Sequence, residues 1–517
     1  MNNKSRLSNS IRNISFGLIA QLLQMVLGFI SRTIFIRYLA VEYLGVNGLF
    51  TNILSLLSLA ELGIAGAISY SLYQPLAEKD EKKLAGLINF FAKVYTRIAL
   101  IIAVLGLMVV PFLDNIVDHP PQGIADNLTL IYLLFLFNTV TSYFMQYKLS
   151  LFQADQKNYI ISKNNILIFM LQNIGQIVVL MLFQNFILYL IVQAVFQLAG
   201  NFIISSQVGK HYPFLDKYTQ ETVDESTKKS IYANVKSMSL VKIGGLLVNS
   251  TDNLILNYFS GLVMVGFLSN YNLLIGLASG LIVQVFSGLT GSIANINAIE
   301  SQEKKIETFH IINFANFWIY GLASIGIIFL INDFIELWIG PKFMLPLSVV
   351  ILLAINFFMY GMQNAVWLFK ITFGFFKQGQ YLIILTAIIN LILSFAFGWY
   401  YGLLGILTAT AIARLVTNTW YDPYIVFKFG LEQNPLDYLK KYIKYLVVIS
   451  VSLAILFGIN YYLPNSGLFG LVCKTMLCLL IPNAIIYLVF KNTSEYKNSM
   501  LLVQAVVGKF KSKFATK

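Results

Sequence analysis

Residues 467–490 read GLFGLVCKTMLCLLIPNAIIYLVF, a run in which Lys474 is the one charged side chain. A helix needs about 20 mostly apolar residues to cross about 30 Å of hydrocarbon. Lipid offers the backbone no hydrogen-bond partner, so a segment that crosses on its own must be helical. This stretch therefore predicts a transmembrane helix, and its two cysteines, Cys473 and Cys478, have neither the number nor the spacing of a disulfide framework or a metal motif.

Segments of the same kind fill most of the preceding sequence, which is 57% hydrophobic and only 11% charged. A soluble domain carries about a quarter charged residues. No alternating pattern of about 10 residues suggests a barrel strand. The sequence predicts an all-α polytopic membrane protein with about 14 transmembrane helices, the first of them uncleaved. The predicted spans are 13–38, 43–73, 86–112, 128–149, 164–184, 186–207, 234–258, 262–296, 309–332, 344–369, 379–400, 402–427, 442–463 and 467–490.

The basic residues indicate the orientation of these spans. Of the 36 lysines and arginines, 27 fall in the loops, termini and adjoining span ends on one side, one (Lys342) falls on the other, and the other eight lie within spans. Under the positive-inside rule, the side rich in lysine is cytoplasmic, so both termini are predicted to be cytoplasmic. The net charge of +13 then reflects contact with an anionic inner leaflet, and no nucleic acid partner is needed to explain it.

The loops leave little room for an enzyme. The longest polar stretch, residues 209–233, lies on the predicted inner side, and no outer loop offers space for a catalytic domain. The three histidines are far apart in sequence, and no nucleophile elbow, zinc motif or dinucleotide motif occurs. The sequence thus predicts no enzymatic activity, no catalytic residue, no cofactor and no metal site.

An internal repeat divides the chain. Residues 81–84, EKKL, recur as EKKI at 303–306, and Lys148, Gln156 and Tyr159 recur as Lys370, Gln378 and Tyr381, all at an offset of 222. Gly45 and Phe50 correspond to Gly266 and Tyr271 at an offset of 221. A nearly constant offset predicts two copies of one six-helix unit. Because six is even, the copies point the same way, which predicts an axis along the membrane normal with a substrate site between them.

The repeat gives a domain organisation. It consists of an N-terminal six-helix lobe (1–208), a cytoplasmic linker (209–233), a C-terminal six-helix lobe (234–428), two further helices (429–490) and a cytoplasmic basic tail (491–517).

Four predicted helices carry polar or small residues at helical spacing. Such a stripe indicates either tight packing of helices through small residues or one wall of a hydrated cavity. The stripes are Gly17, Gln21, Gln24, Gly28 and Ser31/Arg32 in the first span; Asn47, Thr51, Ser55, Ser58 and Glu61 in the second; Lys242, Gly245, Asn249 and Asp252 in the seventh; and Ser269, Asn272, Gly276, Ser279 and Ser287 in the eighth.

Charges inside the spans are candidate functional residues, because each costs at least about 2.5 kcal/mol at the bilayer centre. Arg32 and Asp252 lie in the outer halves of the first and seventh spans, at nearly equivalent positions. They could close an outer gate as an ion pair, engage an anionic substrate through Arg32, or form a permanent interhelical salt bridge. Glu61 is a candidate for neutralising Arg32 or Lys242, or for binding a cation whose movement is coupled to transport. Arg414 and Lys474 are interpreted as structural partners.

Several motifs resemble those of Wzx-type polysaccharide repeat-unit flippases, in the multidrug/oligosaccharidyl-lipid/polysaccharide (MOP) exporter superfamily. They are SRTIFIRYL at 31–39, EYLG at 42–45 and LG at 62–63 in the first half, and STDN at 250–253, VGF at 265–267 and YN at 271–272 in the second. The resemblance implies two six-helix lobes around a cationic cavity, as in MATE transporters and lipid II flippases, with alternating access. It also implies that the last two helices form a groove for a polyprenyl tail.

The resemblance implies a specific function as well: moving undecaprenyl-diphosphate-linked oligosaccharide across the bacterial plasma membrane for capsule or exopolysaccharide synthesis. It matches Arg32 to an arginine that contacts the diphosphate in lipid II flippases. Thr33 stands where those flippases have aspartate, which disfavours lipid II itself. The candidate substrate-binding residues are Arg32, Arg37, Lys242, Gln21, Gln24 and Asn249, and the candidate gate or ion-coupling residues are Asp252 and Glu61.

Alternatives in the same superfamily are a cation-coupled multidrug exporter, using H⁺ or Na⁺, and a lipid II flippase. The expected partners are the polyprenyl-diphosphate-linked oligosaccharide and membrane lipids, with a polysaccharide polymerase and glycosyltransferases acting beside the protein.

Overall fold

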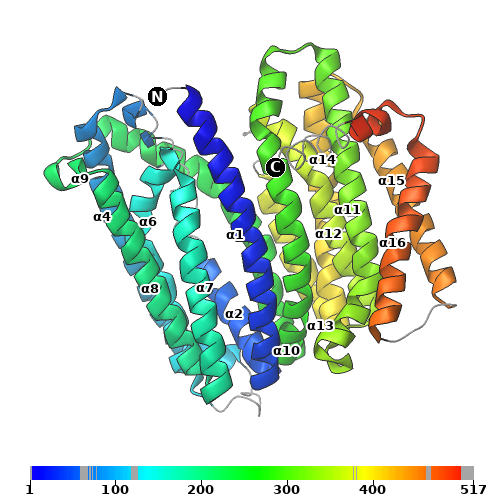
Figure 1. Ribbon diagram of the computed structural model, residues 1–517, viewed down its shortest axis with the longest axis horizontal. Helices are drawn as coiled ribbons and strands as arrows, with labels where there is room; N and C mark the ends of the chain where they lie inside the picture. The colour runs from blue at the N-terminus through cyan, green and yellow to red at the C-terminus, as the bar shows by residue number, and fades with distance from the viewer. Residues whose placement is uncertain are drawn as a thin grey trace, which may run out of the picture. The chain divides into compact units, whose positions relative to one another are not determined.

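The computed structural model describes residues 3–58, 68, 71–72, 74–76, 78–117, 126–155, 157–375, 378–379, 381–461 and 467–501, and their side chains except at 3–20, 230, 233–234, 236–250 and several positions within 284–299. Helices make up almost all of this part of the chain, which confirms the all-α prediction (Figure 1). They are α1 (Asn3–Tyr38), α2 (Val41–Leu57), α4 (Glu81–Val109), η2 (Val110–Phe112), α5 (Leu113–Ile116), α6 (Leu128–Ala154), α7 (Asn158–Phe183), α8 (Phe186–His211), α9 (Phe214–Lys217), α10 (Glu225–Ile299), α11 (Gln302–Ile339), η3 (Pro341–Phe343), α12 (Leu347–Thr372), α13 (Leu382–Val416), α14 (Asn418–Ile425), η4 (Val426–Leu431), α15 (Pro435–Asn460) and α16 (Gly467–Phe490).

The described helices account for the predicted number of crossings. Ten helical segments are long and apolar enough to span a membrane within the described residues. Two of these include a reversal at a glycine, Gly261 in α10 (φ 77°) and Gly402 in α13 (φ 54°), so each supplies two crossings. Helices α1 and α2 bring the total to the predicted 14. The turn at Gly402 falls where the predicted spans 379–400 and 402–427 meet, and glycine adopts its positive φ without a steric penalty.

The chain forms two compact units, Met1–Asn270 and Tyr271–Lys517. This division falls within α10, whereas the repeat predicts a boundary in the linker at 209–233. The first part of α10 contributes to the first unit, where Asn257 Nδ2 donates to the carbonyl of Ile116 at 2.6 Å. The six-helix lobes with their predicted boundaries therefore stay a prediction.

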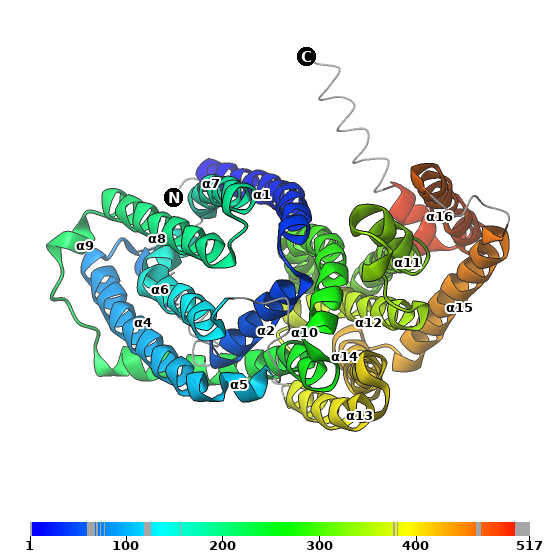
Figure 2. The same ribbon diagram turned by 90° about the horizontal axis from the view of Figure 1, so that it is seen from below.

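In the first unit, each helix packs on the next in an order that differs from the order in the chain. Helix α1 packs against α7, α7 against α8, α8 against α6, and α6 against α4 and α2 (Figure 2). Aromatic side chains fill the junction of α2 and α6, where Phe50 meets the Tyr132 ring edge-to-face at 5.2 Å. The Tyr132 hydroxyl donates to the Gly106 carbonyl at 3.0 Å, which satisfies a buried polar group and ties α6 to α4.

In the second unit, α11 packs against α12, α15 and α16 (Figure 1). Phe317 of α11 stacks on Tyr445 of α15 with ring centroids 3.9 Å apart and an angle of 6°. Phe490, at the end of α16, meets the Phe314 ring at 5.1 Å. Aromatic packing thus fixes the last two helices to the second unit.

The helix starts support the repeat. Asp80 accepts a hydrogen bond from the Lys83 N–H at the start of α4, and Ser301 accepts one from the Lys304 N–H at the start of α11. Aspartate and serine are both favoured N-caps because their side-chain oxygens satisfy an otherwise unpaired amide. The two caps stand 221 positions apart, one position less than the offset of 222 between the adjoining EKKL and EKKI.

Gly45 of α2 and Gly266 of α10, paired by the repeat, lie at a close crossing of their two helices. A Cβ at Gly45 would stand 2.2 Å from the carbonyl oxygen of Leu262. A Cβ at Gly266 would stand 2.8 Å from the carbonyl oxygen of Val41 and 3.4 Å from the Gly45 nitrogen. Small residues permit such backbone approach in membranes, and here the approach requires glycine on both helices.

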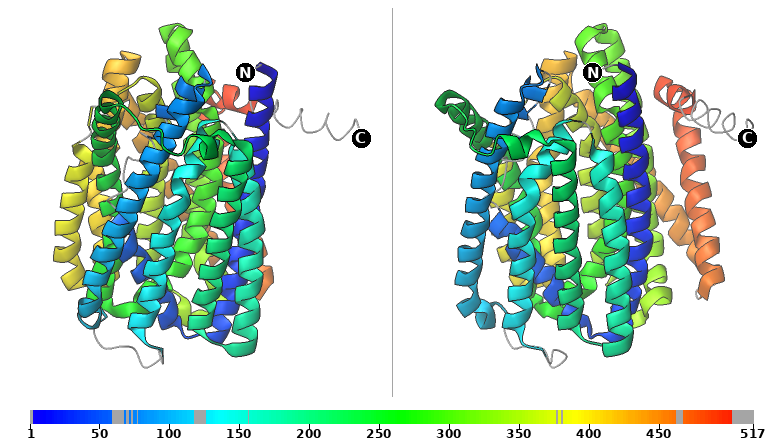
Figure 3. Two further views of the ribbon diagram at one scale, coloured as in Figure 1. Left: turned by 90° about the vertical axis from the view of Figure 1, so that its left-hand side faces the viewer. Right: turned by 60° about the vertical axis from the view of Figure 1, so that its left-hand side comes forward.

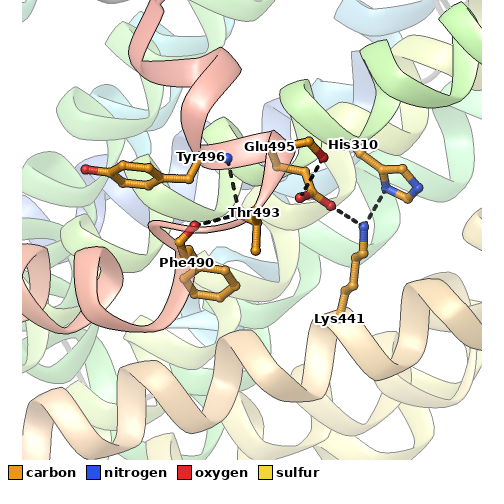
Figure 4. Close-up of polar contacts among 7 residues, drawn as sticks. His310, Lys441, Phe490, Thr493, Glu495 and Tyr496 are labelled. Carbon is orange, nitrogen blue, oxygen red and sulfur yellow. Dashed lines mark hydrogen bonds and ion pairs between the residues drawn. The ribbon is translucent and has the colours of Figure 1, made fainter.

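The chain after α16 is anchored by a polar clamp, which we define as Glu495, Lys441 and His310 (Figure 4). A short helix at 494–501 follows α16 (Figure 3). Lys441 of α15 donates to Glu495 at 2.5 Å and contacts His310 Nδ1 of α11 at 3.1 Å. Beside the clamp, Tyr496 stacks on Trp318 at 5.6 Å. Burial of Glu495 raises its pKa, but hydrogen bonds from Lys441 and its own backbone outweigh burial and hold that pKa below the ordinary value.

We expect Gly45→Ala to destabilise the protein by about 1–3 kcal/mol, because the added methyl group forces two backbones apart. Gly28→Ala is the matched control, since a Cβ at Gly28 would meet nothing within 4 Å. Alanine also favours a helix over glycine by about 1 kcal/mol, so this control should leave stability unchanged or raised. Thermal unfolding in detergent measures both variants. An unfolding temperature of Gly45→Ala equal to that of the wild type would contradict the close crossing.

We expect Glu495→Gln to release the 494–501 helix at pH 7, because the amide cannot neutralise Lys441. In the wild type, a lowered carboxylate pKa gives stability that is present above the ordinary value of 4.5 and is lost as the pH falls below it. Amide hydrogen exchange of 494–501, corrected for intrinsic pH effects, should thus accelerate in acid for the wild type alone. Lys440→Gln is the control, because Lys440 contacts Asp437 of its own helix. Equal protection in all three proteins at pH 7 would refute the clamp.

Candidate functional site

Arg32 lies in α1, six residues before the helix ends at Tyr38. Its side chain is half-buried, and Nη1 donates to the Ser269 hydroxyl of α10 at 3.3 Å. The phenol of Tyr189 in α8 lies beside the guanidinium and is hydrogen-bonded by Ser31. Hydroxyl groups of α10 and α8 therefore lie next to this arginine within the first unit.

An aromatic cluster supports the site from one side. Phe35, one turn after Arg32, meets the rings of Phe186 and Tyr189 edge-to-face at 5.7 and 5.5 Å. Phe186 stacks on Tyr189 at 5.9 Å, and Phe35 and Phe186 are buried. This packing holds Tyr189 against α1 and fixes the position of its hydroxyl next to the Arg32 side chain.

The described polar stripes lie on faces that their neighbours leave open. In α2, Thr51 is exposed and Asn47 and Ser55 are half-buried, whereas Leu49 and Phe50 on the opposite face are fully buried. In the second half of α10, Asn272 and Gly276 are exposed. Amides and hydroxyls that face hydrocarbon lose hydrogen bonds to water, so these faces favour a hydrated surface.

Two glycines in the stripes bear on whether a stripe marks tight helix packing or one wall of a hydrated cavity. A Cβ at Gly28 of α1, or at Gly276 of α10, would meet no atom within 4 Å. Tight helix packing would instead surround these positions, as it does at Gly45 and Gly266. At Gly28 and Gly276, the described part of the chain shows no such close neighbour, which favours the open interpretation, and the meaning of the stripes stays a prediction.

The structure places some of the other predicted residues. Gln21 and Asp252 are half-buried, whereas Gln24 and Arg37 are exposed. Glu61 and the side chains of Lys242 and Asn249 lie outside the described residues. Their assigned roles, and the ion pair between Arg32 and Asp252, stay predictions.

Two neighbours of Arg32 were not assigned to it from the sequence. Ser269 belongs to the polar stripe of the eighth span, but nothing in its spacing pairs it with the first span. Tyr189 lies near the start of α8 in an apolar stretch without any polar pattern. The phenol reaches the arginine because α1 packs against α7 and because the Phe35 ring of α1 meets the Phe186 and Tyr189 rings of α8.

Lys474 has a partner within the second unit. Its ammonium group forms an ion pair with Asp333 of α11 at 2.6 Å, and the Lys474 side chain is buried. A hydrogen bond from Trp318 Nε1 of α11 to Asn483 Oδ1 of α16, 2.7 Å long, joins the same two helices. These contacts support the structural role predicted for Lys474. Among the residues described, no group of three His, Cys, Asp or Glu side chains could hold a metal ion.

Comparison with known proteins finds solved structures with a similar fold. No family model matches the sequence, and no curated protein does either. The structure of the lipid II flippase MurJ in an inward closed conformation is similar with a TM-score of 0.62 and 17% identity, covering 92% of this chain and 99% of that one. This chain has the fold of MurJ and MATE transporters.

Two MATE structures show the same likeness. An inward-facing MATE multidrug resistance transporter of the MOP superfamily gives a TM-score of 0.56 at 14% identity, covering 78% of this chain and 96% of that one. A MATE transporter from Vibrio cholerae gives 0.54 at 15% identity, covering 83% and 99%. At these identities, the likeness concerns the fold, and this multi-pass membrane fold is the one that the sequence motifs predicted.

We expect Lys474→Met to destabilise the second unit by about 3–5 kcal/mol, because it leaves Asp333 without its cation in a membrane helix. Adding Asp333→Asn removes that carboxylate charge, so the double variant should recover much of the loss. Thermal unfolding of the single and double variants in detergent gives the coupling energy. Additive effects of the two substitutions would show that the ion pair contributes no stability.

Proposed function

We propose that the protein is a flippase of the MOP type that moves a polyprenyl-diphosphate-linked oligosaccharide across the bacterial plasma membrane. The observation that carries the proposal is Arg32, a half-buried cation within α1 that lies among hydroxyl groups on a helix with an open polar stripe. The MurJ and MATE fold supports it, because the structures with that fold are named as a flippase and as multidrug resistance transporters.

The chemistry of such a substrate explains these features. A diphosphate and its sugars lose water when they enter hydrocarbon, so passage requires protein groups that replace it. Arginine suits this task because its planar fork binds two phosphate oxygens at once. The hydroxyls and amides of the stripes on α1, α2 and α10 suit the sugar. The polyprenyl tail needs no polar path, since it stays in the bilayer.

The proposal also includes the orientation of the protein in the membrane. The excess of lysine on one side predicts cytoplasmic termini, so the substrate would be made inside and delivered outside. Its expected suppliers and users are glycosyltransferases and a polysaccharide polymerase. Alternating access between inward-open and outward-open states would move the head group without opening a continuous pore.

Two alternatives share the fold. A lipid II flippase would use the same arginine, but Thr33 takes the place of the aspartate expected there, and its hydroxyl donates to the Phe29 carbonyl at 2.8 Å. A cation-coupled drug exporter would depend on a carboxylate such as Asp252 or Glu61. Efflux of a cationic dye driven by an H⁺ or Na⁺ gradient would favour that exporter.

We expect Arg32→Ala to slow flipping by at least tenfold. Losing one charge-assisted hydrogen bond costs about 1.5–3 kcal/mol, which corresponds to a factor of about 10–100. Proteoliposomes containing a fluorescent polyprenyl-diphosphate disaccharide allow the measurement, because dithionite bleaches only the outer leaflet. Wild-type protein should expose nearly all the label, and protein-free vesicles about half.

Lys342→Ala is the matched control, since it removes a cation from the one outer loop that carries a lysine, outside any stripe. It should flip at the wild-type rate. Arg32→Lys should fall between wild type and Arg32→Ala, because lysine keeps the charge but lacks the fork. Wild-type flipping by a well-inserted Arg32→Ala protein would refute the role of Arg32, and inactive wild-type protein would refute the proposed substrate.

A further inference from the structure

One end of α10 packs on the first unit, although the repeat assigns this helix to the second copy. The predicted second copy begins at 234, and yet the first unit extends to Asn270. Asn257, just before the reversal at Gly261, donates to the Ile116 carbonyl at the end of α5 at 2.6 Å. The stretch of α10 around its reversal therefore contacts helices of the first predicted copy.

Backbone contact at this place leaves no room for a side chain. A Cβ at Gly45 of α2 would stand 2.2 Å from the carbonyl oxygen of Leu262, and Gly266 lies at the same crossing. Both glycines lie within about one and a half turns of the predicted outer ends of their helices. One turn further along α2, a Cβ at Gly48 would meet Val265 Cγ1 at 3.4 Å. The crossing thus closes the space between α2 and α10 at this end.

A chain of hydrogen bonds fastens α1 to the same crossing. Arg32 Nη1 donates to the Ser269 hydroxyl of α10 at 3.3 Å, and this hydroxyl donates to the Gly266 carbonyl at 2.8 Å. Because Ser269 stands one turn after Gly266, the arginine reaches α10 beside the glycine contact. Three helices, α1, α2 and α10, are therefore joined at one place by backbone contact and by a polar bridge.

The same helices have open faces deeper in the membrane. Gly276 lies ten residues after Gly266, which is about 15 Å along the helix. A Cβ at Gly276, or at Gly28 of α1, would meet no atom within 4 Å in the described part of the chain. Thr51 of α2, six residues after Gly45, is exposed. The closed crossing thus lies between the predicted outer side and the faces that carry the polar stripes.

We propose that the crossing of α2 and α10, with the bridge from Arg32 to Ser269, is a seal on the outer side that opens in each transport cycle. The opening rests on the proposed function, whereas the closed seal rests on the contacts above. These contacts join helices of two repeats, which have to separate at this end before a head group leaves. Gly45 and Gly266 bring two backbones together without interlocking side chains, so the helices can close tightly and still separate.

A disulfide across the crossing tests the seal. In a chain with Cys473→Ala and Cys478→Ala, the pair Gly48→Cys and Val265→Cys places two thiols where a Cβ already touches its neighbour. Oxidation should slow flipping at least tenfold, because the crossing can no longer open, and dithiothreitol should restore the rate. A glycosidase added outside the vesicles reports the exposed sugar in this assay, since dithionite would itself reduce the disulfide.

The pair Gly175→Cys and Val192→Cys is the matched control. A Cβ at Gly175 would stand 3.1 Å from Val192 Cγ1, and the bridge joins α7 to α8 inside the first predicted copy. Oxidation of this pair should leave the flipping rate unchanged. Flipping at the reduced rate by the oxidised crossing pair would show a permanent packing contact and overturn the seal, and so would equal slowing in both pairs.

Thiol labelling tests the seal without any substrate. Thr51→Cys, in the same chain without native cysteines, places one thiol on the polar face of α2 below the crossing. A membrane-impermeant maleimide outside right-side-out vesicles should label it slowly. Adding Gly45→Ala should raise the labelling rate at least fivefold, because the methyl group forces the crossing apart, whereas Gly28→Ala should not change it. Equal rates in all three proteins would overturn the seal.

The two experiments separate the seal from the proposed function. Normal flipping by the oxidised crossing pair would overturn the seal and leave the flippase intact. A protein that flips nothing in either redox state would refute the proposed substrate, and labelling of Thr51→Cys would then decide by itself whether the crossing closes the outer side.

Discussion

Hydrocarbon provides no hydrogen-bond partner, and this constraint governs every polar side chain within the spans. Some of these groups are satisfied inside their unit, as Lys474 is by Asp333 and Lys370 by Asp422. Others, on α1, α2 and the second half of α10, lie on open faces. A membrane protein that keeps polar groups on open faces needs water or a polar ligand there. The two sets of residues thus separate the scaffold from the candidate transport surface.

Close backbone approach supports this separation. Gly45 and Gly266 allow α2 and α10 to cross with almost no space for a side chain. The opposite situation holds at Gly28 and Gly276, where a side chain would meet nothing. Glycine therefore serves two purposes in the same helices: it permits contact on one face, and it leaves room beside polar residues on the other.

The repeat relates the two units, and their differences are as informative as their likeness. The N-caps at Asp80 and Ser301 and the contacts of Lys148 and Lys370 support a common pattern of packing. Lys148 meets the neutral Ser205 in the first unit, whereas Lys370 meets the charged Asp422 in the second. Packing is conserved between the units while charge is not.

The sequence by itself determined the number and type of spans, since hydrophobic length and helical backbone bonding depend on local composition. It also predicted the repeat and the importance of Arg32, because a charge within an apolar run is visible without any contacts. Tertiary structure alone brought Ser269 and Tyr189 to Arg32 and placed Asp333 against Lys474. These pairings join residues from different helices, and their partners depend on which helix faces pack together. That choice is made by side-chain shape across the whole unit, such as Phe35 against Phe186 and glycine at the α2–α10 crossing, and no periodic pattern in one helix records it.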